Sequence, residues 1–179
     1  MRVIDKSKFN FDRSIYNSDN YCTITNKKFW DGGFDKSASL KEKAEFYDLI
    51  SQFSDIIKQM IISFHDTIIT GSYFCEKNKI FEDWKDKSNF DCFYNISQLF
   101  KKNKHYELEL PDDNDYIDYI IENNFRYFTC FDLFLPKNDI VLQPTCHTEV
   151  IIYAHNYEKI IKLANVLIEK HEGFSILVR

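Results

Sequence analysis

The segment 147-HTEVIIYAHNYEKIIKLANVLIEKHEGFSILV-178 contains the most regular pattern in the chain. Residues 147–154 are rich in β-branched and aromatic side chains, which predicts a strand. Asn156 can cap a helix over residues 157–171, and residues 174–178 predict a second strand. We therefore expect a β-α-β unit, with one parallel pairing added to an otherwise antiparallel sheet.

The residues before this unit predict further strands. Residues 125–135 and 140–144 are two apolar runs separated by the turn sequence Pro-Lys-Asn-Asp at 136–139, which predicts a β-hairpin. Residues 67–75 and 105–110 have strand composition as well. The sheet is therefore expected to be mostly antiparallel.

Helices are predicted before and between these strands in the sequence. Ser39-x-x-Glu42 is a capping box, and it precedes a long helix over about residues 40–64. The apolar stripe of this helix is expected to include Leu40, Ala44, Tyr47, Ile50, Ile57, Ile61 and Phe64. Shorter helices are expected over residues 95–102 and 116–124.

These elements together define an α+β domain. We expect one globular domain over residues 1–179, with a mostly antiparallel sheet packed by the helix at about 40–64 and a C-terminal helix at about 157–171. Residues 1–36 show no sustained hydrophobic periodicity. The alternative for this segment is an irregular N-terminal extension that packs on the domain.

Composition narrows the functional classes. The 179 residues carry a formal net charge of −5, so nucleic acid is not an expected partner. The sequence contains only four Gly and has no Gly-rich nucleotide-binding motif. No apolar run suggests a membrane span or a signal peptide, and the five cysteines contain no C-x-x-C pair. We expect a cytoplasmic protein with reduced thiols, without a metal, a cofactor or a membrane partner. Seventeen Phe, eleven Tyr and two Trp make the chain aromatic-rich.

Two histidines are the candidate catalytic residues. Cys146-His147-x-Glu149 is similar to half of the zinc-deaminase signature, but no P-C-x-x-C follows it. His65-x-Thr67 is similar to the H-x-T motif of two-histidine phosphoesterases, and His147 follows 82 residues later, but Glu149 stands there in place of the second hydroxyl. If residues 147–154 form a strand, His147 and Glu149 share a face. His65, Thr67, His147 and Glu149 are therefore the site of an alternative small hydrolase or phosphoesterase-like enzyme.

Acidic and aromatic residues gather in two other segments. Carboxylates near the predicted helix 116–124 and within 82–94 can stabilise helix starts or form a solvated face. The competing interpretation is a docking surface, because carboxylates steer a basic partner and aromatic rings anchor it. The candidate partner-binding residues are Asp112, Asp115, Tyr116, Asp118, Tyr119, Glu122, Glu82, Asp83 and Trp84.

The absence of an intact catalytic motif favours binding over catalysis. We expect a non-enzymatic, acidic protein-binding module, and most concretely an immunity or inhibitor-type protein that neutralises a cognate toxin or enzyme, whose surface would be basic. Of the cysteines, Cys75 is the one expected to be reactive, because it lies at a strand end before charged residues.

Overall fold

A computed structural model describes residues 2–5, 11–17, 21–28, 38–66, 68–74, 106–110, 114–126 and 129–178. The elements formed by these residues are β1 (Arg2–Asp5), η2 (a 3-10 helix, Arg13–Asn17), β2 (Tyr21–Asn26), α1 (Leu40–Phe64), β3 (Ile69–Phe74), β4 (Tyr106–Glu109), α4 (Asn114–Phe125), β5 (Thr129–Leu135), β6 (Ile140–Thr145), β7 (Glu149–Ala154), α5 (Tyr157–Ile168) and β8 (Phe174–Val178).

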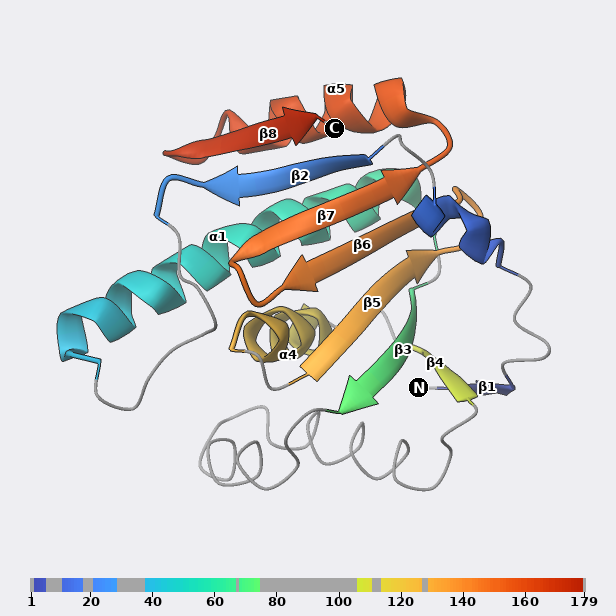
Figure 1. Cartoon of the computed structure of the whole chain (residues 1–179), viewed down its shortest axis with the longest axis horizontal. Helices are drawn as coiled ribbons and strands as arrows, with labels where there is room; N and C mark the ends of the chain where they lie inside the picture. Colours follow the sequence, from blue (N-terminus) through green and yellow to red (C-terminus); the bar gives the residue numbers. More distant parts are fainter. Residues whose placement is uncertain are drawn as a thin grey trace.

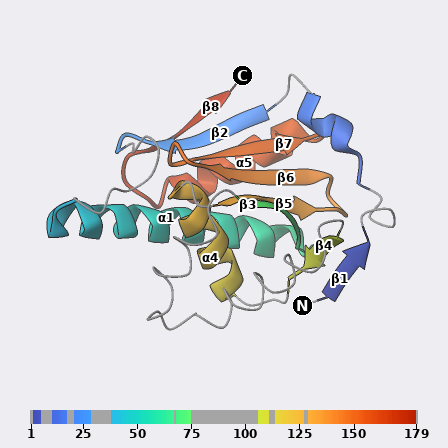
Figure 2. The same cartoon turned by 60° about the horizontal axis from the view of Figure 1, so that its bottom comes forward.

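The eight strands form one sheet in the order β1-β4-β3-β5-β6-β7-β2-β8, and each ladder between these described strands is antiparallel. The helices α1, α4 and α5 pack on one face of the sheet, and η2 packs on the other (Figures 1 and 2). The predicted α+β class, with a mostly antiparallel sheet and two main helices, is confirmed. Within the described residues, no helix has both the length and the apolar character needed to cross a bilayer.

The β-α-β unit is present, but its two strands are not neighbours. β2 lies between β7 and β8 and pairs antiparallel with both of them, so β7 and β8 run parallel with one strand between them. The expected parallel pairing is therefore wrong. The N-terminal region, for which an irregular extension was the alternative, supplies β1 at one edge of the sheet and β2 inside it.

Helix α1 begins at the predicted capping box. The Ser39 Oγ accepts a hydrogen bond from the Glu42 backbone N–H at 3.2 Å, and the Glu42 carboxylate accepts one from the Ser39 N–H at 2.7 Å. The helix ends at His65, whose φ of 47° is left-handed. Both predicted bounds of the helix are confirmed.

The first part of the expected apolar stripe of α1 was wrong. Leu40 is 85% exposed, Ala44 is exposed and Tyr47 is 39% exposed, because the first turns of α1 extend past the sheet (Figure 1). Burial on α1 begins at Phe46. The buried residues of α1 are Phe46, Leu49, Ile50, Phe53, Ser54, Ile56, Ile57, Met60, Ile61 and Phe64.

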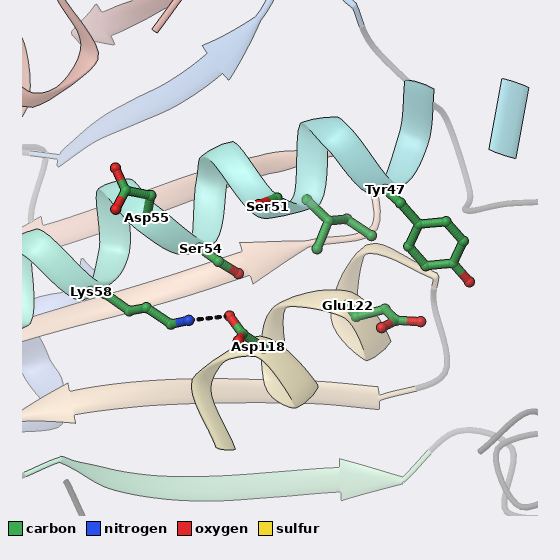
Figure 3. Close-up of a pocket in the computed structure, with 8 residues that line it drawn as sticks. Tyr47, Ser51, Ser54, Asp55, Lys58, Asp118 and Glu122 are labelled. Carbon is green, nitrogen blue, oxygen red and sulfur yellow. Dashed lines mark ion pairs between the residues drawn. The ribbon is translucent and has the colours of Figure 1, made fainter. Parts of the chain in front are cut away.

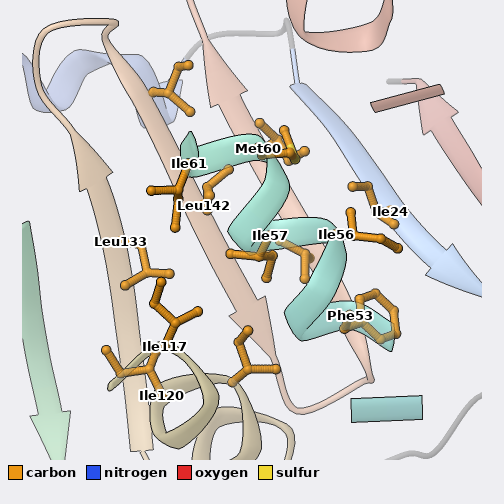
Figure 4. Packing of buried hydrophobic residues seen from close by; sticks show 14 of the residues in the cluster. Ile24, Phe53, Ile56, Ile57, Met60, Ile61, Ile117, Ile120, Leu133 and Leu142 are labelled. Carbon is orange, nitrogen blue, oxygen red and sulfur yellow. The ribbon is translucent and has the colours of Figure 1, made fainter. Parts of the chain in front are cut away.

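The core lies between α1 and the sheet (Figure 4). Phe53 is fully buried, and its ring meets those of Phe125 in α4 and Phe174 in β8 edge to face, with centroids 4.9 Å and 4.8 Å apart. Each such pair stabilises the fold by about 0.5–1.5 kcal/mol beyond the stabilisation that comes from burying the two rings. A smaller aromatic cluster on the opposite face includes the edge-to-face pair of Phe11 and Phe134.

Several predicted boundaries differ from the structure by a few residues. The backbone of α4 continues to Phe125, where a strand was expected to begin. α5 ends at Ile168 rather than at 171, because the His171 N–H bonds to the Ile168 carbonyl in a tighter turn and its ring packs on Phe174. β7 begins at Glu149 rather than at residue 147. The predicted helix at 95–102 lies outside the described residues.

Asp66 connects the end of α1 to the β5–β6 turn through hydrogen bonds. Its buried Oδ2 accepts hydrogen bonds from the backbone N–H groups of Lys137 at 2.8 Å and Asn138 at 3.1 Å, and from the Asn138 side-chain amide at 3.0 Å. The same amide reaches the carbonyl of Phe64 at 3.2 Å. Asp66 therefore positions one end of α1 over the sheet.

We predict that Asp66→Ala lowers the free energy of unfolding by about 1–3 kcal/mol, because it leaves two part-buried backbone donors without their acceptor. Asp66→Asn keeps one carbonyl oxygen in the same place and should cost about 1 kcal/mol. Urea unfolding of the two variants measures the difference. Equal losses would show that the acceptor oxygen is not what stabilises the turn.

Candidate functional site

A groove lies between α1 and α4 on the helical face of the sheet (Figure 3). It encloses about 340 Å³. We call it the α1–α4 groove. Its lining consists of Tyr47, Ile50, Ser51, Ser54, Asp55, Lys58, Asp118 and Glu122.

Helical spacing explains why these side chains share one groove. Tyr47, Ser51, Ser54 and Lys58 are three or four residues apart along α1, so they follow one side of that helix next to its buried stripe. Residues 118 and 122 are four apart on α4. The apolar stripes of both helices enter the same core, which places the two polar sides opposite each other.

Each carboxylate of the groove has a cationic or histidine neighbour. Lys58 Nζ lies 2.6 Å from Asp118 Oδ1, and the Asp55 carboxylate lies 3.1 Å from Nε2 of His171. The Glu122 carboxylate lies 3.3 Å from the Arg126 guanidinium, one turn along α4. The acidic character of the groove is therefore partly neutralised within the chain.

Ser54 is a buried polar residue in the lining of the groove. The residue is only 3% exposed, and its Oγ has no hydrogen-bond partner among the described residues. Ser63, further along the same helix, bonds to the Gln59 carbonyl at 2.7 Å, as helical serines often do. In Figure 3 the Ser54 hydroxyl instead points into the space between α1 and α4.

The acidic candidates from the sequence are only partly on the surface. Asp115 is exposed and Asp118 is half-buried in the groove, but Tyr116 and Tyr119 are 8% and 0% exposed and belong to the main core. The expectation that these two tyrosines anchor a partner was wrong, because they lie on the face of α4 that packs on α1 and the sheet. Glu122 is buried beside its arginine partner. Asp112, Glu82, Asp83 and Trp84 lie outside the described residues.

Six of the eight lining residues of the groove, all on α1, were not identified as site residues from the sequence, and Tyr47 and Asp55 are two of them. Tyr47 was assigned to the apolar stripe, although it is the tyrosine of α1 that faces solvent. Asp55 was not considered. A helical wheel of α1 carries the signal for both, because Tyr47, Ser51 and Asp55 are spaced by four residues beside the apolar stripe.

The two histidines of the alternative enzyme do not converge. His65 follows α1 at the β5–β6 turn, where Asp66 binds the residues of that turn. His147 is exposed in the β6–β7 turn, at the other end of β6. Six residues of strand span about 17 Å, so the rings cannot act on one phosphate. Thr67 lies outside the described residues.

His147 and Glu149 do not form the expected pair on one strand face. Residues 146–148 form a turn in which Thr148 has a φ of 52°, and the strand begins only at Glu149, opposite Thr145. The alternation that predicted a shared face therefore does not extend to His147. Among the described residues, no three His, Cys, Asp or Glu side chains are grouped as metal ligands would be.

A second polar cluster lies on the opposite face of the sheet. Asp132 accepts hydrogen bonds from the Tyr16 hydroxyl at 2.5 Å and the Gln143 amide at 2.9 Å. Arg13 pairs with the buried Glu107 at 2.6 Å. Burial raises the pKa of Asp132 and, with the adjacent carboxylate, that of Tyr16. These bonds hold η2 on the sheet, so we assign the cluster to structure.

Comparison of the chain with protein-family models, with curated proteins and with solved structures finds no match. The candidate function therefore depends on the geometry described above.

We predict that the stability contributed by Asp132 falls as pH rises. Its pKa is raised in the folded state, so its contribution is fully present below its unfolded pKa of about 3.8 and is lost as pH rises through the folded value. The unfolding free energy of the wild type, minus that of Asp132→Asn, should decrease between about pH 4 and pH 8. Urea titrations across this range measure the difference, and the carboxylates common to both proteins cancel.

An unfolding free-energy difference that stays constant with pH would show that Asp132 keeps an ordinary pKa in the folded protein. A difference that increases with pH would show that the folded state favours the charged carboxylate.

We predict that Cys146 reacts with thiol reagents at least about a hundredfold faster than Cys22, because a buried thiol reacts only when the structure opens. Cys22 is fully buried, and burial raises its pKa to about 11. Cys146 is partly exposed in the β6–β7 turn. Peptide mapping after timed alkylation gives both rates, and the urea-unfolded chain is the control. Equal rates in the folded protein would contradict the burial of Cys22. Cys75 lies outside the described residues and stays a candidate.

Proposed function

We propose that this protein is a non-enzymatic binding module that holds a basic protein partner, acting as an immunity or inhibitor-type protein on a cognate toxin or enzyme. The observation that carries the proposal is the α1–α4 groove, in which carboxylates, hydroxyls and an exposed tyrosine line one concave surface. This combination suits lysine and arginine side chains, which donate hydrogen bonds to carboxylates and hydroxyls.

The charge around the groove supports a basic partner. Asp48 is exposed seven residues before Asp55, on the same side of α1, and Asp115 is exposed one turn before Asp118. Together with Glu122 there are five carboxylates. In the part of the chain that the structure describes, Lys58 pairs with Asp118 and Arg126 with Glu122, so the carboxylates outnumber these two cations. A patch of this sign accelerates encounter with a basic surface.

Tyr47 supports the proposal as an anchor. It lies at one end of the groove (Figure 3), and 39% of its surface is accessible. Tyrosine is enriched among the residues that dominate binding energy, and its ring face attracts lysine and arginine cations. Tyr47 thus takes the role that the sequence analysis assigned to Tyr116 and Tyr119.

The alternative enzyme has less support. Its two histidines would have to approach one substrate atom, and β6 keeps them at opposite ends of its length. Binding of a basic protein partner is therefore the single function that we propose.

We predict that a photo-crosslinking amino acid at position 47 captures a basic protein in the native host, whereas the same residue at position 166 does not. Tyr47 and Val166 are both exposed, but Val166 lies on α5 away from the groove. Mass spectrometry identifies the captured protein. Equal capture from both positions, or capture of an acidic protein from position 47, would contradict the proposal.

With that partner purified, we predict that Asp48→Asn with Asp115→Asn slows association about three- to tenfold at low salt and flattens its salt dependence. The matched control is Glu158→Gln with Glu169→Gln, which removes the same charge from exposed positions of α5 and its cap. Asp118 is left unchanged because its loss would leave Lys58 without its partner. Surface plasmon resonance measures the rates, and equal effects of the two double variants would place the interface elsewhere.

A further inference from the structure

Among the described strands, β8 is at one edge of the sheet, and its own residues carry none of the usual protection against edge pairing. It pairs with β2 on one side and is the final strand in the described sheet order. Its sequence Phe-Ser-Ile-Leu-Val contains no charge and no proline, and Leu177 and Val178 are 45% and 58% exposed. The opposite edge, β1, has the sequence Arg-Val-Ile-Asp, with a charged residue at each end. Charged residues and prolines are the common means of blocking edge pairing.

The register of β8 determines which backbone groups face outward. The Lys27 N–H donates to the Gly173 carbonyl at 2.9 Å, so this pair is a hydrogen-bonded one. Hydrogen-bonded pairs alternate along an antiparallel ladder, so the backbone groups of Ser175 and Leu177 also face β2. The N–H and C=O groups of Phe174, Ile176 and Val178 consequently face the free edge.

This arrangement is self-complementary about Ile176. A second copy of β8, placed antiparallel on a two-fold axis through Ile176, pairs Ile176 with itself and Phe174 with Val178 of the other copy. These are the residues whose groups face outward, so three hydrogen-bonded pairs form, each with two bonds. All three side chains are apolar, and no like charges meet.

We propose that β8 is a self-association edge, through which two copies of the chain join their sheets into one continuous antiparallel sheet centred on Ile176. This goes beyond the proposed function, because the α1–α4 groove is formed by other elements. The contact is one short strand on each side, so its area is at the low end for specific interfaces and the dimer should be concentration-dependent. An isologous two-fold contact also closes on itself and does not build fibres.

The direct test is sedimentation velocity of the full chain from about 1 to 500 µM, with Val178→Pro and Val178→Ala as the matched pair. The Val178 N–H faces outward, so proline removes a donor of the dimer without removing a bond to β2. Alanine shortens the same exposed side chain and keeps the donor. We expect the Kd of Val178→Pro to be at least about tenfold higher than that of Val178→Ala. Circular dichroism and thermal unfolding establish that both variants fold.

Amide hydrogen exchange tests the register independently of any variant. Protection of Phe174, Ile176 and Val178 should rise with protein concentration, whereas Ser175 and Leu177 should be protected at all concentrations. A wild-type chain that stays monomeric to about 500 µM overturns the proposal. A dimer that both variants form equally well, or one that leaves exchange at Ile176 unchanged, places the contact elsewhere and also overturns it.

Discussion

The burial of Phe53 is the contact on which the rest of the structure depends. Its ring touches Phe125 of α4 and Phe174 of β8, so one side chain of α1 joins the second helix and the last strand to the long helix. Since the distance between packed helices follows from the side chains between them, this contact also sets how far apart the polar sides of α1 and α4 lie. The dimensions of the α1–α4 groove are therefore a consequence of core packing.

The local chemistry of the sequence predicted the elements well where one signal dominates. The capping box placed the start of α1 at Leu40, and the turn residues 136–139 between two apolar runs placed the β5–β6 hairpin, although β5 begins at Thr129 rather than at residue 125. Errors occurred where two signals compete. The residues 146–148 have strand composition, but the hairpin between β6 and β7 needs a turn there, and Thr148 takes a left-handed conformation to make it. At this point the turn that the tertiary structure requires outweighed the local preference for a strand.

The candidate site was predictable in its chemistry but not in its geometry. The carboxylates of α4 are visible in the sequence, and Asp118 does line the groove. Arg126 follows Glu122 by four residues and could be predicted as its partner, but the partner of Asp118 could not. Lys58 lies sixty residues before Asp118, and only the packing of α1 against α4 brings them together. Tyr116 and Tyr119 were taken as exposed because tyrosine suits both surface and core, and only the orientation of α4 decides between these environments.

The position of β2 makes two segments that lie far apart in the sequence depend on each other during synthesis. Cys22 pairs with Val178, so the ladder between β2 and β8 joins segments separated by nearly the whole chain. Until the ribosome has made residues 149–178, β2 lacks one or both of its neighbouring strands, β7 and β8. Non-local pairing of this kind is slow, and unpaired strands are prone to aggregate before it completes. The sheet can therefore close only after β8 has left the ribosome, and the newly made chain has to stay soluble until then with β2 unpaired.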